Sequence, residues 1–391
     1  MATFANRNIN RLNLHSGLVQ LSFQIGGTFT GAFFLKNGLG LPQVFLVLAA
    51  VLALRFVLRP ILLAISPAIG LKFTLIIGTA LVALQYLAIP QVRGLDAALA
   101  IYILISGIGN VFYWTAYHAV FASLGDAHAR GRQVAFRQIL GAVASIIGPA
   151  AGGFMLAFIG PWAAFGTAAL AAMMSILPLL MIQNDPVARL APSGAYAAAR
   201  KGTVIFLVDG WIISTANTAW ALVIFLALGQ VYDVFGSVLA AAALAGAAGG
   251  FVLGRFIDAG NGRKAAALFG IVTCIVLSAQ TLAGFDATRV VIVTILSAVF
   301  GGLYIPAMMT AIYNDAKQAP CPLRYQIAAE GGWDVGGISA NLTAALLLWA
   351  GLPRHRAGAV VASALCLTIK PRRDRYRRRP SPLRSLHSLS M

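Results

Sequence analysis

The sequence predicts an all-α integral membrane protein, with about twelve transmembrane helices in two repeated six-helix bundles. Its composition is 59% hydrophobic and only 10% charged, which excludes a soluble globular protein. The apolar runs are about 20 residues or longer, the length needed to cross a bilayer as a helix. Similar segments also recur 195 positions apart, with FVLRP at 56–60 and FVLGR at 251–255. Such an internal repeat is typical of a duplicated bundle.

Twelve apolar runs define the expected spans. They cover residues 14–34, 42–66, 73–89, 97–124, 134–158, 162–182, 204–228, 234–257, 265–285, 290–313, 326–352 and 357–369. The first run is too long and, at Gln20 and Gln24, too polar for a cleaved signal peptide, so we expect a retained helix. The expected divisions are a segment at 1–13, bundles at 14–182 and 204–369, a linker at 183–203, and a basic, disordered tail at 370–391.

The distribution of charge predicts the orientation. With a cytoplasmic N-terminus, 23 of the 29 Lys and Arg lie on the cytoplasmic side, Arg59 and Arg137 among them. Five lie on the opposite side, and Arg55 lies within a span. This is the positive-inside bias, and it explains the net charge of +18 without a nucleic-acid partner. We therefore expect a protein of the bacterial inner (plasma) membrane with both termini in the cytoplasm.

Polar side chains within the spans are candidates for a transport path. In span one, Gln24 and Thr28 share a helix face, which lies against either a helix partner or a water-filled cavity. In span four we select Asn110 and His118, and in span seven Asn217. A lone histidine is either a titrating group or a hydrogen-bonded packing residue.

Three carboxylates, Asp209, Glu330 and Asp334, fall within spans and away from the loop turns. Glu330 and Asp334 are four residues apart and therefore lie on one helix face. Placing an acidic side chain inside a membrane costs free energy, and such residues usually have a function. We therefore expect these groups to couple protons to transport. The alternative is a structural ion pair with Arg55 or Arg324, since a nearby arginine favours the ionised carboxylate.

The loop between predicted spans eight and nine concentrates glycines and charges. It reads GRFIDAGNGRK at 254–264, and its selected residues are Gly254, Asp258, Gly262, Arg263 and Lys264. Glycine permits the tight turn, and Asp258 can accept hydrogen bonds from a helix N-terminus or an arginine. The alternative is a solvated connector.

Span five contains GPAAGG at 148–153, with Gly148, Pro149, Gly152 and Gly153. Proline bends a helix, and glycines allow close contact with another helix. We expect Gly152 to pack closely against the opposite bundle. The alternative is an ordinary packing face of small residues.

These motifs resemble those of the major facilitator superfamily. The loop at 254–264 is similar to the superfamily's loop motif, and GPAAGG resembles the fifth-span motif of its antiporters. The resemblance implies two bundles that rock about a central substrate site, a gating role for the loop, and proton-coupled efflux of a small solute by antiport. Uptake by symport is the alternative. Two features depart from the pattern: the first copy of the loop lacks its aspartate, and Ile103 replaces an arginine linked to protons.

Other classes of function lack their sequence signatures. The sequence has no GK[ST] phosphate loop, no His/Cys/carboxylate cluster with metal-ligand spacing, and no GxSxG motif. It also has no aromatic and basic surface typical of nucleic-acid binding. We therefore expect a monomer in the lipid bilayer that binds a small-molecule substrate and protons, with no cofactor and no enzymatic activity. An integral membrane lipid-modifying enzyme is the alternative from another class.

Overall fold

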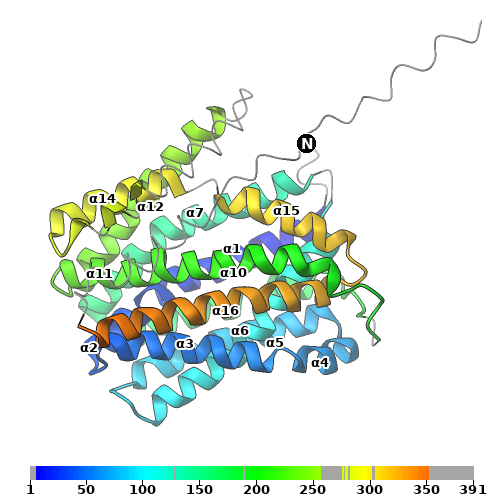
Figure 1. Cartoon of the computed structure of the whole chain (residues 1–391), viewed down its shortest axis with the longest axis horizontal. Coiled ribbons are helices and arrows are strands. Elements are labelled where there is room, and N and C mark those ends of the chain that lie inside the picture. Colours follow the sequence, from blue (N-terminus) through cyan, green and yellow to red (C-terminus); the bar gives the residue numbers. More distant parts are fainter. Residues whose placement is uncertain are drawn as a thin grey trace, which may run out of the picture.

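The computed structural model is an assembly of long helices, most of which run side by side along its longest axis (Figure 1). It describes residues 6–126, 129–187, 190–256, 275–276, 278–280, 282–301 and 304–351. Side chains at 215–217, 253–256, 300–301 and 304–307 are not described.

The helices before the predicted linker are here called the first half, and those after it the second half. The first half contains α1 (Arg7–Ile25), α2 (Thr30–Lys36), α3 (Leu41–Leu58), α4 (Ile61–Ile69), α5 (Leu71–Ala88), α6 (Ala97–Leu124), α7 (Arg130–Phe154), α8 (Pro161–Met174) and α9 (Ile176–Leu180). The second half contains α10 (Arg200–Ile213), α11 (Trp220–Ala227), α12 (Tyr232–Phe256), α14 (Ala287–Gly301), α15 (Tyr304–Gln318) and α16 (Pro322–Trp349).

Seven helical segments among the described residues are long and apolar enough to cross a membrane. They are Arg7–Lys36, Leu41–Leu58, Leu71–Gln91, Ala97–Leu124, Arg130–Ile159, Pro161–Leu180 and Tyr232–Val252. Helix α6 has the bounds predicted for span four, and α16 begins four residues before the predicted start of span eleven. The predicted span 357–369, the basic tail, and four loop residues, Asp258, Gly262, Arg263 and Lys264, lie outside the described residues. Gly254 lies in the last turn of α12.

Several predicted spans are interrupted, among them spans one, two, six and seven. Span two, expected as one helix over 42–66, ends at Leu58 and resumes at Ile61. Pro60 lies at this break and accounts for it. Proline has no N–H to bond to the preceding turn, and its ring clashes with that turn. In span seven, α10 and α11 are joined by a π-helical segment, Ser214–Ala219. Short π-helical segments occur frequently at functional sites.

The two halves touch along their length. Helix α3 packs against α16, and α7 packs against α12; Figure 1 shows α10, α16 and α3 as neighbours. At the end where α6 finishes, here called the inner end, the Phe121 ring stacks on Tyr313 of the second half, with centroids 4.3 Å apart. At the opposite, outer end, Lys36 Nζ donates a hydrogen bond to the Gln230 carbonyl at 3.2 Å. Contacts between the halves therefore exist at both ends.

Glycine allows the backbones of α7 and α12 to meet. A Cβ placed on Gly153 would lie 2.5 Å from the Tyr232 carbonyl oxygen, and one on Gly236 would lie 2.2 Å from the Pro149 carbonyl oxygen. Neither position has room for a side chain. Since apolar burial does not drive helix association in lipid, such close packing carries much of the adhesion between the halves.

The expectation that Gly152 packs against the opposite half is wrong. A Cβ at Gly152 would lie 2.2 Å from the Ile25 carbonyl oxygen of α1, within its own half. Gly148 also faces α1, where a Cβ would meet Gln24. Successive residues of a helix are turned by about 100°, so the next residue, Gly153, faces the second half instead.

A double-mutant cycle tests this assignment. Gly153→Ala and Gly236→Ala should each lower the free energy of unfolding by about 1–3 kcal/mol through overpacking, and their effects should be non-additive. Gly152→Ala should be additive with Gly236→Ala, because it acts at a different contact. The measurement is thermal unfolding of the purified protein in detergent. Gly166→Ala is the control, because a Cβ there meets nothing within 4 Å; coupling between positions 152 and 236 would contradict the assignment.

Candidate functional site

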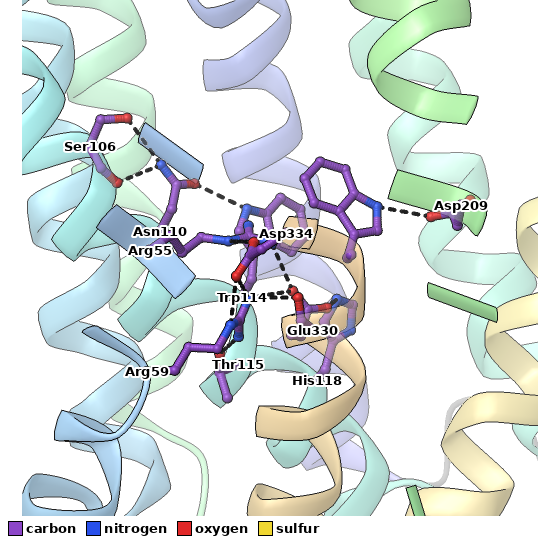
Figure 2. A network of polar contacts seen from close by, with 11 residues as sticks. Arg55, Arg59, Ser106, Asn110, Trp114, Thr115, His118, Asp209, Glu330 and Asp334 are labelled. Atoms are coloured by element: carbon purple, nitrogen blue, oxygen red, sulfur yellow. Dashed lines mark hydrogen bonds and ion pairs between the residues drawn. The ribbon is translucent and has the colours of Figure 1, made fainter. Parts of the chain in front are cut away.

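A network of charged side chains joins α3 of the first half to α16 of the second (Figure 2). Asp334 accepts hydrogen bonds from Arg55 Nε and from Arg59 Nε, the latter at 2.6 Å. Glu330 accepts from Arg55 Nη2 at 3.2 Å, and Arg59 Nη2 lies 3.7 Å from the same carboxylate oxygen. Two arginines and two acids therefore form a ladder of ion pairs between the halves, here called the charge ladder.

The local spacing of the sequence makes this ladder possible. Arg55 and Arg59 are four residues apart, as are Glu330 and Asp334, and residues four apart lie on one helix face. Helix α3 ends at Leu58, so Arg59 is its first residue past the end. Arg59 nevertheless keeps a helical backbone conformation that holds it on the same face as Arg55. The two pairs consequently meet across the α3–α16 contact.

Burial makes the charge ladder strong and costly to break. Asp334 is fully buried, and the other three side chains are at most 4% exposed. Arg59 Nη1 also donates to Thr115 Oγ1 at 2.8 Å, and its Nη2 donates to the Glu330 carbonyl at 2.9 Å. Removing one partner of a buried ion pair costs about 3–5 kcal/mol, because an unpaired charge stays behind. The ladder therefore constrains how the two halves can separate.

His118 of α6 links Glu330 to a third helix. Its Nε2 lies 3.3 Å from Glu330 Oε1, and its Nδ1 lies 2.7 Å from the Tyr313 hydroxyl of α15. An ionised carboxylate only accepts, so Nε2–H donates to Glu330 and Nδ1 accepts from the Tyr313 hydroxyl. Tyr313 stacks on Phe121 at the inner end. A chain of hydrogen bonds thus runs from the inner end to the ladder.

Asp209 of α10 lies beside the ladder rather than within it. Its Oδ2 accepts a hydrogen bond from Trp333 Nε1 at 3.0 Å, and the Arg55 guanidinium carbon lies 4.9 Å from the centroid of the Trp333 ring. Asp209 and Trp333 both belong to the second half. Asp209 therefore positions an aromatic ring against Arg55.

The remaining predicted residues lie elsewhere in the bundle. Asn110 Nδ2 donates to the Ser106 carbonyl at 2.8 Å, and its Oδ1 accepts from Trp114 Nε1 at 3.1 Å. Gln24 Nε2 donates to Ser145 Oγ of α7 at 2.8 Å, so it meets a helix partner within its own half. The side chain of Asn217 lies outside the described residues. Within the described part of the chain, no three His, Cys, Asp or Glu residues are placed to hold a metal ion.

Comparison with known proteins identifies the family. The sequence profile of the Major Facilitator Superfamily matches residues 12–319, which is more than half of the chain. The chain belongs to the Major Facilitator Superfamily. Its members are secondary transporters and not enzymes, which rules out the lipid-modifying enzyme as an alternative. No curated protein matches the sequence.

Solved structures of superfamily transporters share the fold. The human organic anion transporter MFSD10 (TETRAN) is 15% identical, with a TM-score of 0.67 over 93% of this chain and 97% of its own. A variant of the E. coli fucose:proton symporter FucP is 13% identical, with a TM-score of 0.60 over 92% of this chain and 97% of its own. These likenesses confirm the all-helical superfamily fold.

Two arginines that the positive-inside count assigns to the cytoplasmic side lie within the bundle. Arg59 was counted among the cytoplasmic bases, but it is buried in the charge ladder. Arg137 was counted in the same way, but it lies about 10 Å along α7, at 1.5 Å per residue. The matched four-residue spacings of the arginines and the acids could have revealed Arg59. The sequence carries no comparable signal for Arg137.

The charge ladder predicts an unusual sensitivity to loss of Asp334. Asp334→Asn should lower the free energy of unfolding by about 3–5 kcal/mol, because two buried arginines are then left with one acid. The double variant Arg59→Met/Asp334→Leu should recover part of this loss by removing both partners and leaving Arg55 paired with Glu330. Thermal unfolding in detergent measures both, with the exposed Asp315→Asn as control. Equal unfolding temperatures for Asp334→Asn and Asp315→Asn would contradict the expected cost of leaving a buried arginine without its acid.

Proposed function

We propose that this transporter is proton-coupled, that Glu330 carries the coupled proton, and that it exports a small solute by antiport. The observation that carries the proposal is the charge ladder, which places two carboxylates on one half opposite two arginines on the other. Alternating access requires the halves to move apart at one end while they close at the other. Any opening at the inner end must therefore weaken the ladder.

Protonation of Glu330 offers a way to weaken it. The ladder as a whole is neutral, and a proton on Glu330 replaces a charge–charge interaction with Arg55 by an ordinary hydrogen bond. Asp334 is held by the closer contacts, including Arg59 Nη2 at 2.5 Å, so we assign the coupled proton to Glu330. Protonated Glu330 thus lowers the cost of separating α3 from α16, which links proton binding to opening.

His118 and Tyr313 supply a path for that proton. A proton that reaches His118 Nδ1 from the Tyr313 side allows Nε2–H to pass its own proton to Glu330 Oε1, 3.3 Å away. The imidazole then returns to its neutral state with the other tautomer. Because Tyr313 lies against Phe121 at the inner end, we propose that Glu330 exchanges protons with the cytoplasmic side.

Proton coupling and the direction of transport are supported by two different observations. The fold is shared with FucP, which is described as a proton symporter, and this favours proton coupling here. The GPAAGG segment resembles the fifth-span motif of antiporters, which favours efflux. Symport remains the second candidate because Ile103 stands where superfamily members often have an arginine linked to protons.

Substitution of Glu330 tests the proposal. In vesicles with an imposed pH gradient, a solute screen first identifies what the parent protein accumulates. Glu330→Gln should then keep downhill exchange of that solute and lose its pH-driven accumulation, because a neutral amide cannot exchange a proton. Asp315→Asn, an exposed acid on α15, should behave as the parent. Accumulation by Glu330→Gln equal to that of the parent would mean that another group couples protons.

Reporter fusions test the proposed orientation in the bacterial inner membrane. Fusions at Gly194 and after Pro371 should report the cytoplasm, and fusions at Gly40 and Gly160 the opposite side, because the basic residues gather on the first of these sides. Reversed reporters at Gly40 and Gly194 would place the inner end of the charge ladder outside the cell. A reversed reporter after Pro371 alone would show that the run at 357–369 does not span.

A further inference from the structure

Arg137 is a third arginine inside the bundle, on α7. Its Nε donates a hydrogen bond to Ser16 Oγ of α1 at 3.2 Å. Its guanidinium carbon lies 5.2 Å from the centroid of the Tyr117 ring of α6. The side chain is half-buried and lies close enough to His118 and Tyr313 to interact with both electrostatically. Arg137 is therefore a neighbour of the charge ladder, on the side of the first half.

No acid among the described residues is paired with Arg137. Arg55 and Arg59 are each paired with carboxylates, whereas no carboxylate among the described residues lies within 4.0 Å of Arg137. Its described partners are the Ser16 hydroxyl and the ring and hydroxyl of Tyr117, all of them neutral groups. Glu330 and Asp334 are already compensated by the other two arginines, and Asp209 bonds to Trp333. A guanidinium inside a membrane bundle without an anion is expensive and typically marks a substrate pathway.

The groups around Arg137 suit a ligand that has an anionic group and a planar aromatic ring. The guanidinium uses Nε for Ser16 and lies beside the Tyr117 hydroxyl, and a guanidinium can pair with the two oxygens of a carboxylate or sulfonate. The Tyr117 hydroxyl is buried beside it and makes no hydrogen bond of good geometry with the described residues. Tyr113 stacks on Tyr117 at 5.9 Å, and the half-buried Trp114 meets Tyr113 edge-to-face at 4.9 Å. Donors and aromatic faces thus lie side by side.

We propose that the transported solute is a small aromatic anion. Its carboxylate or sulfonate pairs with Arg137 and accepts a hydrogen bond from Tyr117, and its ring lies against Trp114. This inference rests on the proposed transport function, because it takes the region beside the charge ladder as the solute site. An anion at Arg137 also supplies the counter-charge that no described acid provides.

Binding of benzenesulfonate to the full-length protein in lipid nanodiscs tests the inference. Benzenesulfonate stays charged and does not cross bilayers as a neutral acid, and benzenesulfonamide and phenyltrimethylammonium serve as neutral and cationic counterparts. The protein should bind the radiolabelled anion and prefer it to both counterparts. Arg137→Gln should weaken binding at least tenfold, Arg137→Lys less, and the exposed Arg132→Gln, on the same helix, not at all. Tyr117→Phe, which removes only the hydroxyl, should weaken binding of the anion but not of benzenesulfonamide.

The outcomes separate this inference from the proposed function. Failure to bind benzenesulfonate, a preference for either counterpart, or equal binding by a folded Arg137→Gln would overturn the anion site. If Arg137→Gln does not fold, an unchanged affinity in both Arg137→Lys and Tyr117→Phe would overturn it instead. Benzenesulfonate that binds and crosses proteoliposomes without any response to a pH gradient would contradict proton coupling and leave the anion site standing.

Discussion

The structure depends on one constraint, which is that four charges between α3 and α16 must neutralise one another away from water. In a medium of low dielectric the attraction within such a set is strong, but so is the cost of removing each charge from water. The ladder therefore does little to stabilise the folded chain beyond what an apolar contact would give. We infer instead that the ladder fixes how the two halves meet, and that a change in its charge makes their separation easier.

Other features of the fold keep the two halves in close contact. Glycines at 153 and 236 let α7 and α12 approach until backbone atoms touch, because no side chain fits between them. The break at Pro60 redirects the chain just after the second arginine. Aromatic contacts such as Phe29 with Phe235, at 5.5 Å, close the outer end. The four side chains of the ladder are at most 4% exposed, and a proton on Glu330 therefore changes the balance of charge in a site with little access to water.

Composition and the lengths of the apolar runs were enough to predict the fold, because a bilayer leaves the backbone few alternatives. Superfamily membership was likewise predictable from the motifs at 148–153 and 254–264. The site was only partly predictable. Asp209, Glu330 and Asp334 stand out as acids within apolar runs, and Arg55 as the base nearest in depth. Which helices touch is decided by tertiary packing, so the partners of Gly152 and Gly153, the burial of Arg59 and the unmatched charge of Arg137 became visible only in the structure.

The central claim is that protonation of Glu330 frees the inner end to open. Distance measurement between spin labels tests it most directly, with labels at Gly131→Cys on α7 and Gln318→Cys on α15, two exposed positions at the inner end of different halves. The three native cysteines are replaced by serine. Lowering the pH from mildly alkaline to mildly acidic should shift the distances toward longer values, and Glu330→Gln should show the longer distances at both pH values. Distances that do not change with pH in the parent, or that remain short in Glu330→Gln, would contradict the claim.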